Sequence, residues 1–213
     1  MNKYYTPHEV SQHNEAKDLW LSFLGKVYNL TEFCKINSDN ILTKLLIMAA
    51  GTDISHWFDP ETKSLKTFID PKTELNLHYC QNGRVMHVEP PYPDSSWDNN
   101  FKRPWWLDLS FAIGILTKKT RQIVIVNTLT SQKHIIEVCS EETMYDILQR
   151  YLVYNSHAKS YTWKYNLVDL DMNKTLEANG VKDEDEIFYK LSIDDDLYIP
   201  SIHLYFNDDL TED

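Results

Sequence analysis

The chain has 213 residues, of which 42% are hydrophobic and 25% are charged, a composition typical of an ordered globular protein. Its formal net charge is −11, and residues 121–213 alone carry 8 basic and 18 acidic residues, which disfavours nucleic-acid binding. No apolar run reaches about 18 residues, so no membrane-spanning helix is expected, and the first residues do not resemble a signal peptide. Three scattered cysteines predict neither a disulfide framework nor a zinc site and favour a reducing compartment.

The first ninety residues predict short helices and one β-hairpin. A capping box at Thr6-Pro7-His8-Glu9, with proline at the first helical position, indicates a helix that ends near His13. The apolar stretches 20–24 and 27–30 flank Gly25-Lys26 and predict a hairpin. Three further helices are expected: one capped by Thr31, one from Asn40 to Ala50 that ends at Gly51, and one from Asp53 to Phe58.

A proline-rich stretch then interrupts the pattern. Three prolines and two serines within residues 89–96 exclude a helix or a central strand. We therefore expect a first domain over residues 1–89, a linker over 90–117 and a second domain over 118–213. The linker carries Trp97, Trp105 and Trp106, and two interpretations of these side chains remain open. They form either a partner-binding patch, since tryptophan is enriched at interface hot spots, or a staple that folds back onto the domains.

The second half predicts a sheet and one main helix. Alternating apolar residues at 121–128 and 134–138 indicate a hairpin, and an apolar stripe through residues 141–154 indicates a helix. Further strands are expected at 161–165, 186–191 and 202–206, with a turn at Asn179-Gly180. Both domains thus belong to the α+β class.

Residues 5–89 resemble the cytochrome b5 domain. The stretches that carry the resemblance are Tyr5-Thr6-Pro7-His8-Glu9-Val10, His13-Asn14, Asp18-Leu19-Trp20, Gly25 to Phe33 and Ala50-Gly51-Thr52-Asp53. The resemblance implies haem bound between two helical pairs, with one axial histidine from each pair. The two ligand positions correspond here to Asn37 and Lys63, so neither holds a histidine. We therefore expect no bis-histidine haem site and no cofactor.

Residues 118–213 are similar to the ubiquitin-like (β-grasp) fold in their hairpin–helix–strand order and in the stretch Thr175 to Ile187. The chain ends in Leu210-Thr211-Glu212-Asp213 rather than Gly-Gly, which favours a binding module over a conjugated modifier.

The chain as a whole resembles a family of motile cilia that joins these two domains. The resemblance rests on stretches such as Asp53 to Pro60, Pro104-Trp105-Trp106, Asn127 to Gln132, Tyr161 to Tyr165 and Leu204 to Glu212. It implies a cytoplasmic, cytoskeletal protein of the ciliary axoneme, in a hetero-complex with radial spoke proteins and away from membranes. A non-catalytic structural or regulatory adapter that supports ciliary beating is the expected function. The alternative is a haem-binding, redox-sensing or electron-carrying cytochrome b5-type protein.

Few residues are candidates for chemistry. His56 is a displaced haem ligand or a structural histidine, and the same alternatives hold for His78 and His87. Cys34 and Cys80 are either redox-responsive or buried, inert thiols. The sequence has no nucleophile elbow, no His-Glu-x-x-His and no glycine-rich phosphate loop, so no catalytic residue and no metal site are expected.

Two further regions are candidates for partner contacts. Trp163 shares one strand face with Tyr161 and Tyr165, and this face is either a partner surface or core. Asp208 and Asp209 belong to an acidic tail that suits a basic groove on a partner.

Overall fold

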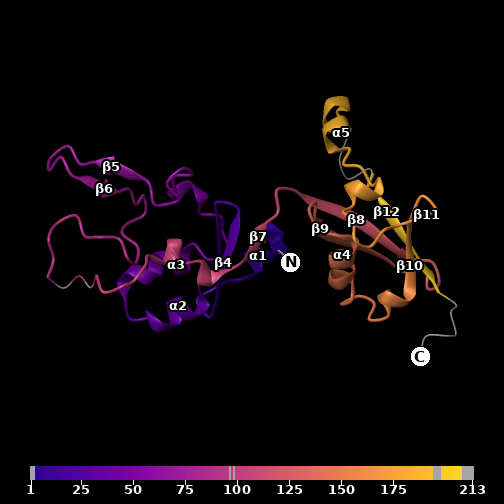
Figure 1. The fold of residues 1–213 in the computed structure, drawn as a ribbon, viewed down its shortest axis with the longest axis horizontal. Helices are drawn as coiled ribbons and strands as arrows, with labels where there is room; N and C mark the ends of the chain where they lie inside the picture. Colours follow the sequence, from indigo (N-terminus) through magenta and orange to yellow (C-terminus); the bar gives the residue numbers. More distant parts are fainter. Residues whose placement is uncertain (1–2, 96, 98, 194–197, 208–213) are drawn as a thin grey trace. The chain divides into compact units, whose positions relative to one another are not determined.

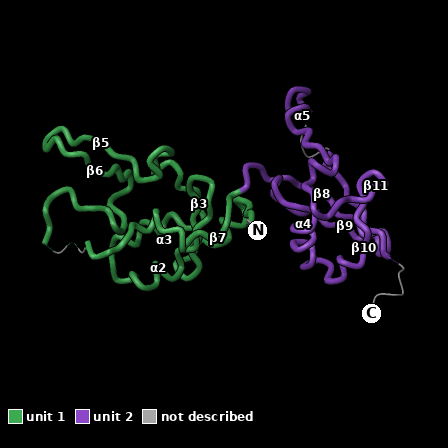
Figure 2. The backbone as a smooth tube through the Cα atoms, in the orientation of Figure 1, with its two compact units in different colours: residues 1–116 green, residues 117–213 purple. Residues whose placement is uncertain are grey.

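The computed structural model describes residues 3–95, 97, 99–193 and 198–207 (Figure 1). The chain divides into two compact units, residues 1–116 and 117–213 (Figure 2). The first unit thus extends well beyond residue 89. Residues 90–116 of the expected linker belong to this unit, and residues Ala112–Leu116 form a strand of its sheet. No described helix combines the length and the apolar character that a membrane span requires.

The first unit is built on a five-stranded sheet with the strand order β1-β7-β4-β3-β2. These strands are β1 (Tyr4–Tyr5), β2 (Asn14–Glu15), β3 (Asp18–Phe23), β4 (Lys26–Asn29) and β7 (Ala112–Leu116). The predicted hairpin is confirmed as β3–β4, and its two-residue loop places both Leu24 and Gly25 at positive φ, as a type I′ turn requires. A separate hairpin pairs β5 (Thr67–Ile69) with β6 (Asn76–His78).

Short helices surround this sheet: α1 (Pro7–Gln12), α2 (Thr31–Ile36), α3 (Lys44–Met48) and the 3₁₀ helices η1 (Ile41–Thr43), η2 (Ser55–Trp57), η3 (Trp105–Leu107) and η4 (Leu109–Phe111). The capping box at the start of α1 is confirmed, with Thr6 and Glu9 exchanging both hydrogen bonds. Thr31 does not cap α2 as expected. Its Oγ1 instead accepts a hydrogen bond from the Leu19 backbone of β3, so this side chain ties the helix start to the sheet.

The second unit has a five-stranded sheet with the order β11-β10-β12-β8-β9, in which β12 runs parallel to β8 and the other pairs are antiparallel. The strands are β8 (Thr120–Asn127), β9 (Lys133–Cys139), β10 (Tyr161–Tyr165), β11 (Val168–Asp169) and β12 (Ser201–Phe206). Helix α4 (Met144–Tyr151) packs its apolar face on this sheet in one core. Two 3₁₀ helices, η5 (Ala158–Ser160) and η6 (Glu177–Asn179), lie in the connections.

The strand expected at 186–191 is wrong, because this segment forms helix α5 (Asp185–Leu191) (Figure 1). Both long edges of the central strand β12 are already paired, to β10 and β8, and none of the described side chains of α5 is buried. Asp185 and Glu186 lie in its first turn and Lys190 in its last, which complements the helix dipole. The alternation of apolar residues therefore reflects no buried strand face.

Candidate functional site

The two positions that correspond to haem ligands have structural roles. Asn37 caps the end of α2, where its side-chain amide donates a 2.8 Å hydrogen bond to the Phe33 carbonyl. Its own carbonyl accepts a hydrogen bond from Thr43, which joins α2 to η1. Lys63 lies exposed in the turn after η2, with a positive φ. Neither side chain is one of the usual haem ligands, because the asparagine amide offers only a weakly basic carbonyl oxygen and the lysine ammonium has no free lone pair.

Aromatic side chains fill the core of the first unit. The ring of Phe58, five residues before Lys63, stacks on Phe23 at a centroid distance of 4.4 Å. Trp105 packs edge-on against both rings, at 5.8 Å from Phe23 and 6.3 Å from Phe58. Its side chain is fully buried, and Trp106 is almost so. The same core includes side chains of β3, α2 and α3 together with Val85, Met86 and Val88.

The structure corrects the expectation that Trp105 and Trp106 contact a partner. Both side chains lie inside the first unit because η3 turns inward just before β7 enters the sheet. Trp106 also donates a 3.3 Å hydrogen bond from its indole nitrogen to the Ser64 hydroxyl. Of the two interpretations of this segment, folding back onto a domain is the one that applies to these two residues. Trp97 is half-buried beside Phe101, and its partner role stays a prediction.

The histidines of this unit are separate and differ in environment. His56 is exposed on η2, with its ring edge-on to Trp57. His78 binds the Glu89 carboxylate through Nδ1 at 2.7 Å. The Nδ1 atom of His87 accepts a hydrogen bond from the Trp105 backbone, so the proton of its neutral ring lies on Nε2 and neither nitrogen has a lone pair free for iron. Burial lowers the pKa of His87, which favours this neutral form.

The described residues therefore do not fit bis-histidine coordination of haem. The two corresponding positions hold an amide and an ammonium, and the core of the unit is packed with the chain's own rings. His56 is exposed on η2, so it stays a candidate for a single, displaced haem ligand. Within the described ranges, no three histidine, cysteine or acidic side chains gather as a metal site.

The two candidate thiols are protonated at neutral pH. Burial raises the pKa of Cys34 to about 11, and burial is also the main reason that the pKa of Cys80 is raised. Because the thiolate is the reactive form, neither cysteine has the environment of a redox-responsive residue. Both are free thiols.

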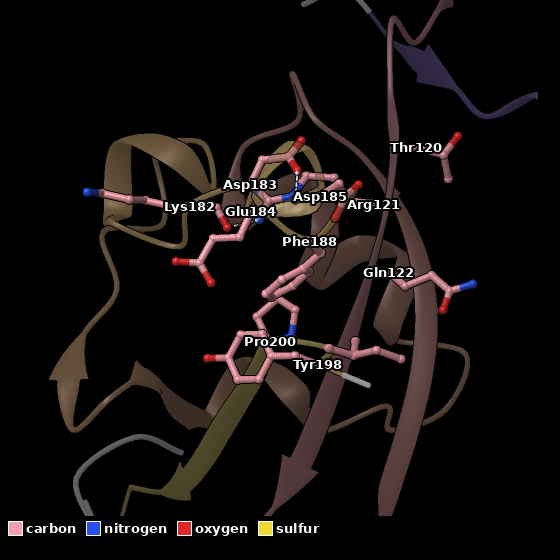
Figure 3. A pocket seen from close by; sticks show the side chains of 11 residues that line it. Thr120, Arg121, Gln122, Lys182, Asp183, Glu184, Asp185, Phe188, Tyr198 and Pro200 are labelled. Carbon is pink, nitrogen blue, oxygen red and sulfur yellow. Dashed lines mark hydrogen bonds between the residues drawn. The ribbon is translucent and has the colours of Figure 1, made fainter. Parts of the chain in front are cut away.

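A hollow of about 200 Å³ in the second unit lies between β8, the loop before α5 and the start of β12 (Figure 3). Three of its charged lining residues, Arg121, Asp183 and Asp185, are held by contacts within the unit. Lys119 pairs with Asp183 and Asp185, each at 2.6 Å, and Arg121 donates to the carbonyls of Val181 and Lys182. Desolvation lowers the pKa of Lys119, but the hydrogen bonds that its ammonium donates to the two carboxylates outweigh this effect, and the pKa is raised. These contacts anchor the loop before α5 to the start of β8.

The Tyr161–Trp163–Tyr165 face is core, which corrects the partner role considered for Trp163. The indole ring is buried edge-on to Tyr151 of α4 at 5.8 Å, and its nitrogen donates to the Ala158 carbonyl. The single helix α4 covers this face of the sheet, and a large ring on the central part of β10 packs under it. Asp208 and Asp209 lie outside the described residues.

Sequence reasoning missed Arg84. This residue lines a hollow beside β6, and its Nη1 atom is buried without a hydrogen-bond partner among the described residues. The surrounding stretch Gln81-Asn82-Gly83 is polar and matches no motif, so the sequence contains no signal that distinguishes this arginine from a surface one.

Comparison with known proteins identifies the relatives of the chain. The family described as "Cytochrome b5-like Heme/Steroid binding domain" matches residues 6–71. "Cytochrome b5 domain-containing protein 1" of Xenopus laevis is 58% identical over 99% of this chain and 97% of its own length. The Homo sapiens protein of the same name is 53% identical over 99% and 92%.

Two partial likenesses concern the separate halves. The seed isoform of cytochrome b5 from Nicotiana tabacum is 41% identical over 27% of this chain and 42% of its own length. A designed protein based on ubiquitin aligns with 45% of this chain and 99% of its own at 13% identity, and the TM-score of 0.32 is too low to carry an argument about fold. Since the full-length relatives share more than half of their residues with it, the chain belongs to the cytochrome b5 domain-containing protein 1 family.

Proposed function

We propose that this chain is a non-catalytic adapter of the ciliary axoneme, held in a hetero-complex with radial spoke proteins and supporting ciliary beating. One observation carries the non-catalytic part. The core of the cytochrome b5-like unit contains Trp105, Trp106 and the 85–88 segment, and the two ligand positions hold Asn37 and Lys63. A scaffold that keeps its fold without the histidine ligands of its cofactor is suited to presenting surfaces.

The arrangement of the second unit supports a binding module. Its first hairpin, β8–β9, is followed by α4, and β12 enters parallel to β8 at the centre of the sheet. This order supports the ubiquitin-like assignment that the sequence resemblance implies. Residues 121–213 carry a net charge of −10, which favours partners with basic surfaces, through orientation and association rate more than through raw affinity. The placement in cilia and in the radial spoke rests on the sequence resemblance alone.

A haemin titration of the purified full-length chain tests the non-catalytic part. We expect no stoichiometric complex with a sharp Soret band. A complex that is lost in His56→Ala and kept in the control His8→Ala, an exposed histidine of α1, would instead favour the haem-binding alternative through a single displaced ligand. A stoichiometric complex lost only when Asn37 or Lys63 is changed would directly contradict the claim that these two positions do not bind haem.

Incorporation into axonemes tests the assembly part. A tagged chain expressed in ciliated cells that lack the endogenous protein should co-fractionate with axonemes and restore beating. We expect Trp97→Ala, or truncation after Asn207, to reduce incorporation without loss of thermal stability, because Trp97 is half-buried at the surface and the truncated residues follow the last strand. A fully soluble wild-type chain that leaves beating unchanged would refute the axonemal role. Wild-type incorporation of both stable variants would place the contacts elsewhere.

A further inference from the structure

A hollow of about 290 Å³ lies in the first unit beside the β5–β6 hairpin, at the edge of the core, with which it shares Val88. Most of its wall is apolar or aromatic, and Arg84 contributes a charge to it; the residues that matter here are Phe68, Leu77, Tyr79, Arg84, Val88 and Pro91. An open groove along residues 89–95 and Trp97 shares Leu77, Glu89 and Pro91 with this hollow. A concave, largely apolar site with one or two placed polar groups has the make-up of a small-molecule site.

The guanidinium of Arg84 has a buried nitrogen that no described residue accepts a hydrogen bond from. Its Nη1 atom is buried, yet it has no hydrogen-bond partner among the described residues. A buried donor of a charged group that is left unpaired costs more than a neutral one, and such groups are rare in folded proteins. An unpaired guanidinium nitrogen at the wall of a hollow therefore indicates a missing acceptor.

The neighbouring groups do not supply that acceptor. The Glu89 carboxylate, which also lines the hollow, accepts a 2.7 Å hydrogen bond from His78. The Cys80 thiol stays protonated at neutral pH because burial raises its pKa, so it brings no negative charge to Arg84. The rest of the wall that the argument uses, Phe68, Leu77 and Val88, is hydrocarbon.

We propose that this hollow binds a small organic acid, with the carboxylate on Arg84 and the apolar body against Phe68, Leu77 and Val88. A carboxylate matches the planar fork of guanidinium donors and forms charge-assisted hydrogen bonds with it. The volume suits a single ring or a short chain, since typical ligand pockets begin at about 300 Å³. This site is independent of the adapter role and of the haem positions.

Binding of phenylacetate to the full-length chain, compared with phenylacetamide, tests the proposal. Amide chemical shifts followed by NMR report both the site and the affinity. We expect saturable shifts at residues 77–91 with phenylacetate, and binding at least about tenfold weaker with the uncharged amide, the effect of losing one charge-assisted hydrogen bond. Equal affinity for acid and amide, saturation only elsewhere in the chain, or no saturable binding with a Kd below about 1 mM overturns the proposal.

Variants assign the effect to the guanidinium. Arg84→Met should weaken phenylacetate binding at least about tenfold while the melting temperature stays the same or rises, because an unpaired buried donor is removed. Arg103→Met, at an exposed arginine of the same unit, should change neither quantity. If Arg84→Met does not fold, Arg84→Lys keeps a charge without the fork and should still weaken binding. Wild-type affinity in whichever variant folds refutes the assignment.

A peptide arm distinguishes the source of the carboxylate. An N-acetylated Phe-Asp peptide amide presents the same chemistry as part of a protein partner. Equal or tighter binding of phenylacetate supports the small acid as ligand. Arg84-dependent binding of the peptide without binding of phenylacetate overturns it in favour of a protein segment.

Discussion

The Glu142 carboxylate is buried in the second unit, and its charge is balanced by Arg150. The Arg150 Nε atom lies 2.9 and 2.8 Å from the two carboxylate oxygens, and the Cys139 backbone donates to one of them. Glu142 is only 5% exposed, so removing its partner leaves an uncompensated buried charge. We expect Arg150→Met to lower the unfolding free energy by about 3–5 kcal/mol in urea titrations.

A double variant provides the control for this pair. Glu142→Gln combined with Arg150→Met removes both charges, and the glutamine side-chain oxygen can still accept from Cys139. We expect the double variant to be more stable than Arg150→Met alone, because the two changes affect one contact and are not additive. A double variant that is less stable than the single one would mean that lost packing, rather than the unpaired charge, dominates.

The Glu141 side chain predicts part of the pH dependence of stability. Desolvation raises its pKa, but hydrogen bonds from the Thr117 hydroxyl and the Lys118 backbone outweigh this, and the pKa of Glu141 is lowered in the folded state. The unfolded value is about 4.3, so these bonds stabilise the fold above that pH, and the contribution is lost as pH falls through the lower folded pKa. Glu141→Gln should therefore flatten the fall in unfolding free energy below about pH 4.3.

The matched control is Glu137→Gln, at an exposed position of β9. Its acid-unfolding curve should keep the wild-type slope. If Glu141→Gln also keeps that slope, the hydrogen bonds to Thr117 and Lys118 do not distinguish the folded from the unfolded carboxylate.

At the scale of elements, β7 fits between β1 and β4 only because Gly114 has no side chain. A methyl group at this position would overlap the Lys3 carbonyl oxygen and the Tyr5 ring of β1. The backbone oxygen cannot move without opening the sheet, so Gly114→Ala should destabilise the first unit by about 1–3 kcal/mol, as overpacking does. Urea unfolding followed by tryptophan fluorescence measures this loss of unfolding free energy. The exposed Leu109→Ala change just before β7 should have little effect; equal losses in both would contradict the steric explanation.

Helix α5 illustrates how an element can depend on its surroundings. Ile187, Tyr189 and Leu191 alternate as in a strand, yet all three are more than half exposed on a helix. A strand here could pair only at the outer edge of β11 or β9, because both edges of the central strand β12 are taken by β8 and β10. An alternating pattern of apolar residues indicates which side chains would share one face of a strand. It does not indicate whether the fold provides a neighbouring strand to pair with that segment.

At the scale of the whole molecule, the unit boundary at 116/117 predicts which fragments fold. Residues 1–116 should fold alone, whereas residues 1–89 should not, because they lack Trp105, Trp106 and strand β7. Residues 117–213 should also fold alone, since they contain a core of their own. Dispersed amide spectra of the fragments measure this. A well-folded 1–89 fragment would show that the tryptophan segment is dispensable for the first core.

The sequence by itself determined the features that depend on neighbouring residues. The capping box of α1, the β3–β4 and β8–β9 hairpins and the apolar stripe of α4 are each encoded within a stretch of at most 20 residues. Such signals are readable because backbone hydrogen bonds, turn conformations and side-chain periodicity are local. The absence of histidine at positions 37 and 63 was equally plain from the residues alone.

The tertiary structure decided what the large and charged side chains meet. Trp105 and Trp106 are core because β7 joins a sheet whose other strands all end by residue 29, at least 83 residues before β7 begins at residue 112. Trp163 likewise faces α4 rather than solvent because the fold packs Tyr151 of that helix against it. The Nη1 atom of Arg84 has no hydrogen-bond partner because the fold brings no described acceptor near it. An aromatic ring gains free energy wherever it leaves water, whether in a core or at an interface. The sequence around an aromatic residue therefore cannot distinguish a core position from an interface position. Only the packing of segments that are distant in the chain distinguishes them.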